Sequence, residues 1–206
     1  MSKQQMNAMG TLNNRWGVCG FTSSLYALYE HSPALRSQLT SSAKVSTRVI
    51  AEMKSFLRQL EADGNAKMLT EIADFTRSFE GFGGFTIADY IRRIDAVAAK
   101  GSSYAKGDFS IALPPEAVAA YLRYIGFRNP QVLPSGADLT GKNELGLGLT
   151  DPTGKLTMYD GLCHYVYQKG TTIFSWGREF TSVAEAGKGN PDTVGWTTCV
   201  IVSPHG

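Results

Sequence analysis

One cysteine and one histidine, distant in the chain, have the surroundings that thiol chemistry requires. Cys19 stands in "NNRWGVCGF" (residues 13–21), between Gly17 and Gly20 and at the start of a predicted helix. The positive end of a helix favours a thiolate, and small neighbours let a carbonyl group approach the sulfur. His164 stands in "GLCHYVY", at the start of a predicted strand. We therefore predict a nucleophile at Cys19 and its general base at His164.

Each of these two residues also has an ordinary structural interpretation. A cysteine among apolar residues is often only a buried thiol, and a strand histidine often makes one structural hydrogen bond. The other two histidines are poorer partners for the thiol. His31 lies more than ten residues along the predicted helix from Cys19, and His205 lies in the terminal tail.

The spacing of apolar residues predicts a helical half followed by a strand-rich half. Helices are expected at about 19–30, 45–64, 68–79, 87–97 and 113–127. Strands are expected at about 131–133, 145–149, 164–168, 171–176 and 195–203. The predicted fold class is therefore α+β with an antiparallel sheet, in one domain of residues 1–206. Its mainly helical lobe covers about 1–128 and its mainly β lobe about 129–206.

A hairpin within residues 164–176 brings a hydroxyl group to the histidine. If residues 169–170 form a two-residue turn, Gln168 pairs with Thr171 and His164 faces Ser175. The Ser175 hydroxyl then accepts the imidazole N–H and fixes the tautomer of the ring.

Other residues can take that orienting role. A slip of one residue in the hairpin would place Phe174 or Trp176 opposite the histidine instead. The acidic alternatives are Glu179, Asp160 and Asp192. A Cys–His pair without a third member is a further possibility.

Composition narrows the classes of partner. The 20 Lys and Arg residues nearly balance the 18 Asp and Glu residues, so nucleic acid is not an expected partner. No apolar run is long enough to span a bilayer, and no membrane partner is expected. Three cysteines without a CxxC pair predict neither a structural metal nor a disulfide framework, and no cofactor is indicated. Because the N-terminus has no apolar signal region, we expect a cytoplasmic protein or one secreted without a classical signal peptide.

These features together resemble the papain-like cysteine peptidase clan. His164 comes 145 residues after Cys19, within the range of about 130–150 residues found in papain-type enzymes. In that clan an amide side chain about six residues before the cysteine lines the oxyanion hole, and Asn13, with Asn14 beside it, has this position. "FSWG" at 174–177 resembles the Asn-Ser-Trp-Gly segment of the clan.

The resemblance implies a papain-like fold and further site residues. It implies that Asn13 or Asn14 stabilises the oxyanion, and that Trp176 shields the hydrogen bond of the histidine from water. Separately, Trp16, Gly17 and Trp176 are candidates for contact with the substrate, and core packing is the alternative for both tryptophans. The chain departs from the clan in two places: asparagine replaces the usual glutamine of the oxyanion hole, and Phe174 replaces the usual Asn or Asp that orients the histidine.

The function implied is that of a thiol-dependent hydrolase of peptide or carboxamide bonds. Proteolysis, deamidation and cleavage of peptidoglycan amides share this chemistry, and the substrate is expected to be a protein or peptide. Small chains of this type resemble secreted bacterial effectors or toxins, whose partners include immunity and host proteins. The alternative is a non-catalytic binding, immunity or adaptor protein with the same fold, which the phenylalanine at 174 favours.

Overall fold

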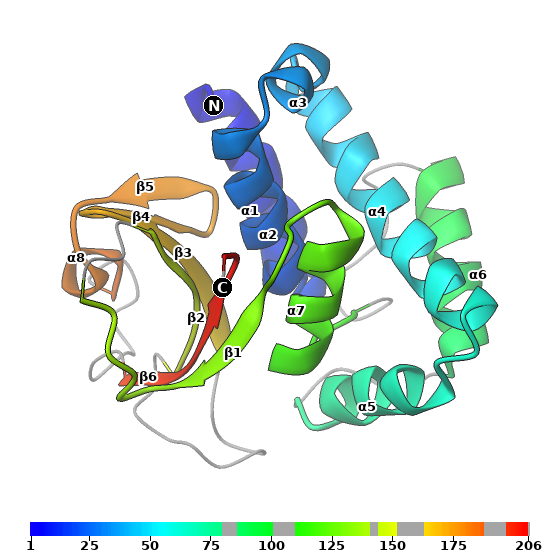
Figure 1. The fold of residues 1–206 in the computed structure, drawn as a ribbon. Helices are drawn as coiled ribbons and strands as arrows, with labels where there is room; N and C mark the ends of the chain where they lie inside the picture. The colour runs from blue at the N-terminus through cyan, green and yellow to red at the C-terminus, as the bar shows by residue number, and fades with distance from the viewer. Residues whose placement is uncertain (80–85, 101–109, 141–143, 152–162, 188–196, 206) are drawn as a thin grey trace.

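Helices fill one half of the molecule and a sheet fills the other (Figure 1). The computed structural model describes residues 1–79, 86–100, 110–140, 144–151, 163–187 and 197–205. Within these residues the helices are α1 (Lys3–Trp16), α2 (Cys19–His31), α3 (Pro33–Gln38), α4 (Ser42–Ala62), α5 (Ala66–Arg77), α6 (Ile87–Lys100), α7 (Pro115–Tyr124) and the short α8 (Val183–Gly187).

The second half is an antiparallel sheet in the order β1-β6-β2-β3-β4-β5. Its strands are β1 (Gln131–Pro134), β2 (Glu144–Asp151), β3 (His164–Lys169), β4 (Thr172–Ser175), β5 (Arg178–Phe180) and β6 (Thr197–Ser203). The predicted α+β class, with a helical N-terminal half and an antiparallel sheet, is thereby confirmed.

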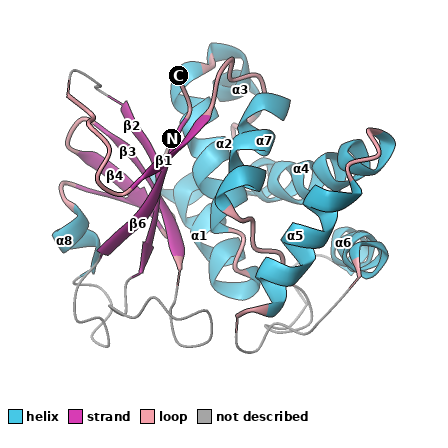
Figure 2. Cartoon of the chain, turned by 60° about the horizontal axis from the view of Figure 1, so that its bottom comes forward, coloured by secondary structure: helices cyan, strands magenta, loops and turns pink. Residues whose placement is uncertain are grey.

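Helix α2 joins the two halves, because it is buried on every side over residues 19–27. Toward the other helices, the ring of Phe21 packs edge-on against Tyr121, with centroids 4.8 Å apart. Toward the sheet, Tyr26 stacks on Phe174 at 4.1 Å, and Ser23 Oγ donates a hydrogen bond to Tyr165 O at 3.1 Å. Figure 2 shows α1 and α2 between the sheet and the outer helices. A helix in this position holds its first residue between the halves.

Helix α1 was not predicted from the sequence, although its signals are present. Ser2 and Gln5 form a capping box at its start. Its buried face includes Met6, Met9 and Asn13, which follow one another at spacings of three and four residues. The polar residues between them hide this pattern, since the helix is short of apolar residues as a whole.

The β3–β4 hairpin has a different turn from the predicted one. The pairs are Lys169 with Thr172, Gln168 with Ile173 and Tyr167 with Phe174, so the turn is Gly170-Thr171 rather than Lys169-Gly170. Gly170 has a φ of 58°, and a two-residue turn of the type II′ class requires such a residue at its first position. The turn thus moves by one residue, which shifts every cross-strand partner by two and leaves each side chain on its predicted face.

Candidate active site

The thiol of Cys19 lies where two consecutive helices meet. Helix α1 ends at Gly17, whose N–H donates to Asn13 O at 2.9 Å, and Cys19 is the first residue of α2. The first N–H groups of a helix have no partner within it. The N–H groups of Cys19 and Gly20 accordingly interact with the sulfur, and each lowers the pKa of the thiol.

Burial has the larger effect on this thiol. Cys19 is 9% exposed, and its Sγ accepts a hydrogen bond from the N–H of Tyr165 at 3.5 Å. The cost of removing a thiolate from water exceeds the help of these N–H groups, so the pKa of Cys19 is raised to about 11. The resting group at neutral pH is therefore the neutral thiol.

His164 is the first residue of β3, and its ring is also buried. The residue is 3% exposed, and burial lowers the pKa of its imidazole to about 3. Its Nε2 lies 3.0 Å from the Oγ of the fully buried Ser175. In the tautomer that carries the proton on Nε2, this N–H donates to Ser175 and the lone pair stands on Nδ1.

The contact between His164 and Ser175 is present although their predicted direct pairing is wrong. With Tyr167 opposite Phe174, the same register brings Ser175 level with Val166. His164 is two residues away on the same face of the sheet, so it reaches the hydroxyl diagonally. The prediction survived the error in the turn because a shift of two residues conserves the face.

A cavity of about 470 Å³ brings the thiol and the imidazole together from opposite halves of the fold. Asn13, Cys19 and Leu113 line it from the helical half, and His164 and Trp176 line it from the sheet. Within the described residues, no direct hydrogen bond joins Cys19 Sγ to the imidazole. The thiol is instead linked to the residue that follows His164, through the Tyr165 N–H.

A tight turn covers one face of the imidazole. Trp176 and Gly177 connect β4 to β5 with φ values of 43° and 73°, the two positive values that a type I′ turn requires. The ring of Trp176 stacks on that of His164, with centroids 4.1 Å apart and an angle of 11° between the planes. A bulky residue with positive φ is strained, so its neighbours must hold it in place.

Helix α1 supplies that support through a close backbone approach. A Cβ atom added at Gly10 would collide with the carbonyl oxygen of Trp176, and one added at Gly177 would collide with Met6 O. The absence of both side chains lets the turn lie directly on α1. This contact fixes the height of the Trp176 ring over His164.

The two asparagines that the resemblance suggests for an oxyanion both contribute to the cavity. Asn13 and Asn14, at the end of α1, both line the cavity. Asn13 is 6% exposed, and its Oδ1 has no hydrogen-bond partner among the described residues. Asn14 is exposed at the cavity rim. This oxygen is an acceptor and can receive an N–H group of a ligand, whereas only the Nδ2 group of the same amide can donate to an oxyanion.

The remaining predicted residues differ in their placement. Gly17 and Trp176 line the cavity as expected. Trp16 does not: it is 1% exposed within the core, and its carbonyl oxygen accepts a hydrogen bond from Ser110 Oγ at 2.7 Å. Its expected contact with substrate is therefore corrected to core packing.

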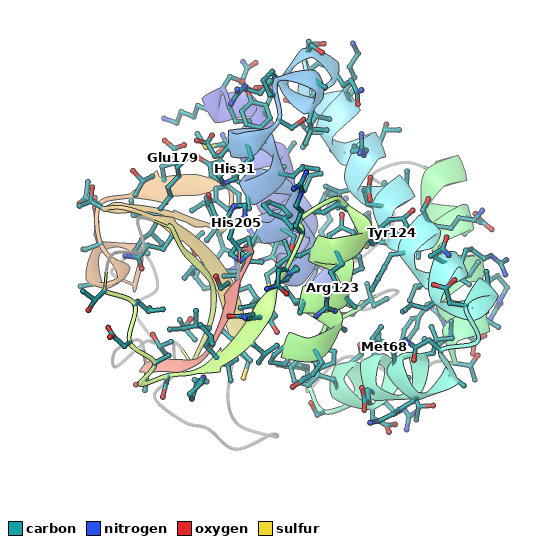
Figure 3. All side chains as sticks on the ribbon, in the orientation of Figure 1. His31, Met68, Arg123, Tyr124, Glu179 and His205 are labelled. Atoms are coloured by element: carbon teal, nitrogen blue, oxygen red, sulfur yellow. The ribbon has the colours of Figure 1, made fainter. Side chains whose placement is uncertain are left out.

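Of the acidic alternatives to Ser175, Glu179 alone lies within the described residues, and its carboxylate bonds to another group. Glu179 accepts a hydrogen bond from the hydroxyl of Tyr26 on α2. Figure 3 shows Glu179 on β5, beside the upper part of α2. The proposed orienting role of Glu179 is thus replaced by a link between β5 and α2. Asp160 and Asp192 lie outside the described residues.

Comparisons with protein-family models, curated proteins and solved structures found no match to this chain. The function of the protein must therefore be inferred from the geometry of the site. Among the described residues, no group of three or more His, Cys, Asp or Glu side chains is placed to hold a metal ion. None of the helices in these residues has the length and apolar content needed to cross a membrane.

Several contributors to the cavity and its support were not predicted from the sequence, Arg178, Phe75 and Gly10 among them. Arg178 and Phe75 line the cavity, and Gly10 carries the turn over the histidine. The position of Arg178 directly after "FSWG" was a usable signal, since a tight turn there returns the chain to the same site. Gly10 stands on the same helical face as Met6 and Asn13, which the spacing of α1 would have indicated.

Proposed function

We propose that this protein is a thiol-dependent hydrolase of papain-like type, acting on peptide or carboxamide bonds. The observation that carries the proposal is the shared cavity of Cys19 and His164. The thiol comes from the start of a helix and the imidazole from the start of a strand, and the imidazole is held by Ser175 and Trp176. A nucleophile, a base and a residue that orients the base are the components of such a site.

The buried neutral groups favour a mechanism in which proton transfer accompanies attack. Sγ of Cys19 bonds to the carbonyl carbon while its proton passes to Nδ1 of His164. The C–N bond then breaks, and His164 gives this proton to the leaving nitrogen. Water adds to the thioester with His164 as base, which releases the carboxylic acid and restores the thiol. The Cys19 N–H and the Asn13 amide are the donors we assign to the oxyanion.

The substrate class follows from this chemistry only in part. Proteolysis, side-chain deamidation and cleavage of peptidoglycan amides all use it, and a role as a bacterial effector or toxin with an immunity or host partner belongs to the same proposal. A second candidate is a non-catalytic binding protein of the same fold. The raised pKa of Cys19 and the lowered pKa of His164 favour it, because both keep the pair uncharged.

Acyl transfer from 4-nitrophenyl acetate separates the two candidates without knowledge of the substrate. A hydrolase releases nitrophenolate with turnover and carries a transient acetyl group on Cys19, detected by mass spectrometry of the quenched protein. Cys19→Ser and His164→Gln abolish both signals. If Cys19 is acetylated no faster than Cys163 and Cys199, and His164→Gln changes nothing, the hydrolase proposal is rejected and the binding protein stands.

A further inference from the structure

The cavity contains one side chain whose charge the reaction described above does not use. Arg178, at the start of β5, is the only charged residue among the described residues that line it. The residue is exposed, and its guanidinium takes part in none of the ion pairs or side-chain hydrogen bonds of the described chain. An arginine presents a rigid, planar set of donors that matches a carboxylate.

Arg178 shares a face of the sheet with the residue that holds the imidazole, because it pairs directly with Ser175, whose Oγ lies 3.0 Å from His164 Nε2. The leaving nitrogen must come within hydrogen-bond reach of His164, which protonates it. Trp176 stacks on that imidazole, and Arg178 is the residue that follows the Trp176-Gly177 turn. A leaving amine beside His164 therefore extends toward the guanidinium.

Apolar side chains from the helical half lie beside Asn13 and Asn14 in the same cavity. Phe75, Ala112 and Leu113 line the cavity from the helical half, and the side chain of Phe79 packs edge-on against Phe75 with centroids 5.1 Å apart. An acyl group bound to Cys19 as the thioester can pack against these side chains, because all of them line the cavity that contains the thiol. The helical half thus contributes apolar and amide side chains but no charge among the described lining residues, and the sheet half contributes Arg178.

We propose that Arg178 selects amides whose leaving amine carries a carboxylate, while the acyl side is apolar; this inference rests on the proposed hydrolase function. The bonds that form and break are those of the hydrolysis above, and Arg178 neither gains nor loses a proton. The carboxylate belongs either to the C-terminus of a leaving residue or to an acidic side chain next to the scissile bond.

A matched pair of esters tests the proposal. 2-Nitrophenyl acetate and 4-acetoxy-3-nitrobenzoate transfer the same acetyl group, and their nitrophenolate leaving groups differ by one carboxylate. The ratio of kcat/KM for the charged over the neutral ester falls roughly fivefold in Arg178→Gln, and further in Arg178→Glu. Arg178→Lys retains part of the preference for the charged ester. In the unmodified protein the ratio declines as salt is added.

Three controls make the result specific. Arg128→Gln removes an exposed arginine that is not on the cavity wall, and it leaves the ratio unchanged. Mono(2-nitrophenyl) succinate has its carboxylate on the acyl side and does not respond to Arg178→Gln. Product inhibition distinguishes the two possible sources of the carboxylate. As inhibitors, alanine carries only the α-carboxylate, and aspartic acid α-amide carries only the side-chain carboxylate.

The outcomes separate this inference from the proposed function. If Cys19 hydrolyses both esters and the ratio is equal in the unmodified protein and Arg178→Gln, the role of Arg178 is overturned while the hydrolase stands. If the succinate ester responds as strongly as the nitrobenzoate, Arg178 is not on the leaving-group side and the proposal is wrong. If neither ester depends on Cys19, the hydrolase itself is refuted and this inference with it.

Discussion

Nε2 of His164 lies 3.0 Å from Oγ of Ser175, and both side chains are buried. A hydroxyl group can orient an imidazole through this hydrogen bond, but it has no charge with which to stabilise an imidazolium. The lowered pKa of His164 agrees with that, since burial is its only resolved cause. The site thus combines an imidazole held by a hydrogen bond with a thiol and a ring that are both uncharged at rest.

Removing the hydroxyl of Ser175 should weaken catalysis more than the fold. In Ser175→Ala the ring loses its hydrogen bond, and we expect kcat/KM for 4-nitrophenyl acetate to fall about tenfold. Ser37→Ala is the control, because its exposed hydroxyl bonds only to Ala34 O on α3. Equal rates in both variants would show that Ser175 does not position the base.

The buried imidazole should make stability depend on pH in the acidic range. The unfolded chain protonates His164 near 6.5 and the folded chain near 3, so between these values the unfolded state binds one more proton. Stability from this group is therefore complete above 6.5 and is lost as the pH falls. We expect the free energy of unfolding to lose up to about 1.4 kcal/mol per pH unit from this residue.

Denaturant unfolding at several pH values measures this effect. The difference in unfolding free energy between the unmodified protein and His164→Gln, followed against pH, isolates the contribution of His164, because the other titrating groups are common to both. His31→Gln, at an exposed position, should keep the full slope. A slope that His164→Gln leaves unchanged between pH 4 and 6.5 would contradict the burial of a neutral ring.

The reactivity of the Cys19 thiol should depend on pH in the alkaline range. With the pKa of Cys19 raised to about 11, the thiolate fraction grows about tenfold per pH unit from pH 7 to 10. Alkylation of Cys19 by iodoacetamide, followed by peptide mapping, should rise in parallel. A plateau reached below pH 8 would instead indicate a preformed thiolate–imidazolium pair.

Adding one methyl group to α1 should disturb the site from outside it. In Gly10→Ala the new Cβ collides with Trp176 O, and we expect a loss of about 1–3 kcal/mol in stability and slower acyl transfer. Helix propensity alone would make Gly10→Ala more stable, so the expected loss of stability comes from the collision. Gly136→Ala, whose Cβ meets no atom within 4 Å, serves as control. A Gly10→Ala protein as stable and active as the unmodified one would refute the close contact.

Glu179 should matter for stability and not for the base. Because Tyr26 donates to its carboxylate, Tyr26→Phe is expected to cost about 1–3 kcal/mol of unfolding free energy. Glu179→Gln keeps an acceptor at this place and should leave kcat/KM for the ester unchanged. Loss of acyl transfer in Glu179→Gln, with the fold intact, would return Glu179 to the catalytic site.

The sequence was most informative where one local pattern determines the structure. The helical spacing before Gly64 and the alternation around His164 placed the major elements and both members of the candidate pair. Ser175 was found through the face of a hairpin strand, which a shift of two residues does not change. Helix α1 was missed because polar residues on its exposed face dilute its buried stripe.

Other properties of the site depend on contacts between distant segments. No local pattern reveals that Trp16 turns into the core while Trp176 covers the imidazole, because both are aromatic residues beside glycine. The pKa values of Cys19 and His164 are set by the packing of the two halves, and the motifs alone had indicated an activated thiol. Arg178 follows the "FSWG" segment directly, but only the cavity shows that its charge lies beside the thiol and the imidazole.

The contact of Gly10 with the Trp176-Gly177 turn joins the first helix of the chain to one of its later strands. The cover of the imidazole is thus carried by a helix that contributes neither the nucleophile nor the base. A fragment that begins at α2 would keep Cys19, His164 and Ser175, yet the turn above the ring would have nothing to lie on. The arrangement around the imidazole is therefore a property of the assembled chain, because it depends on a contact between its first helix and a turn near its other end.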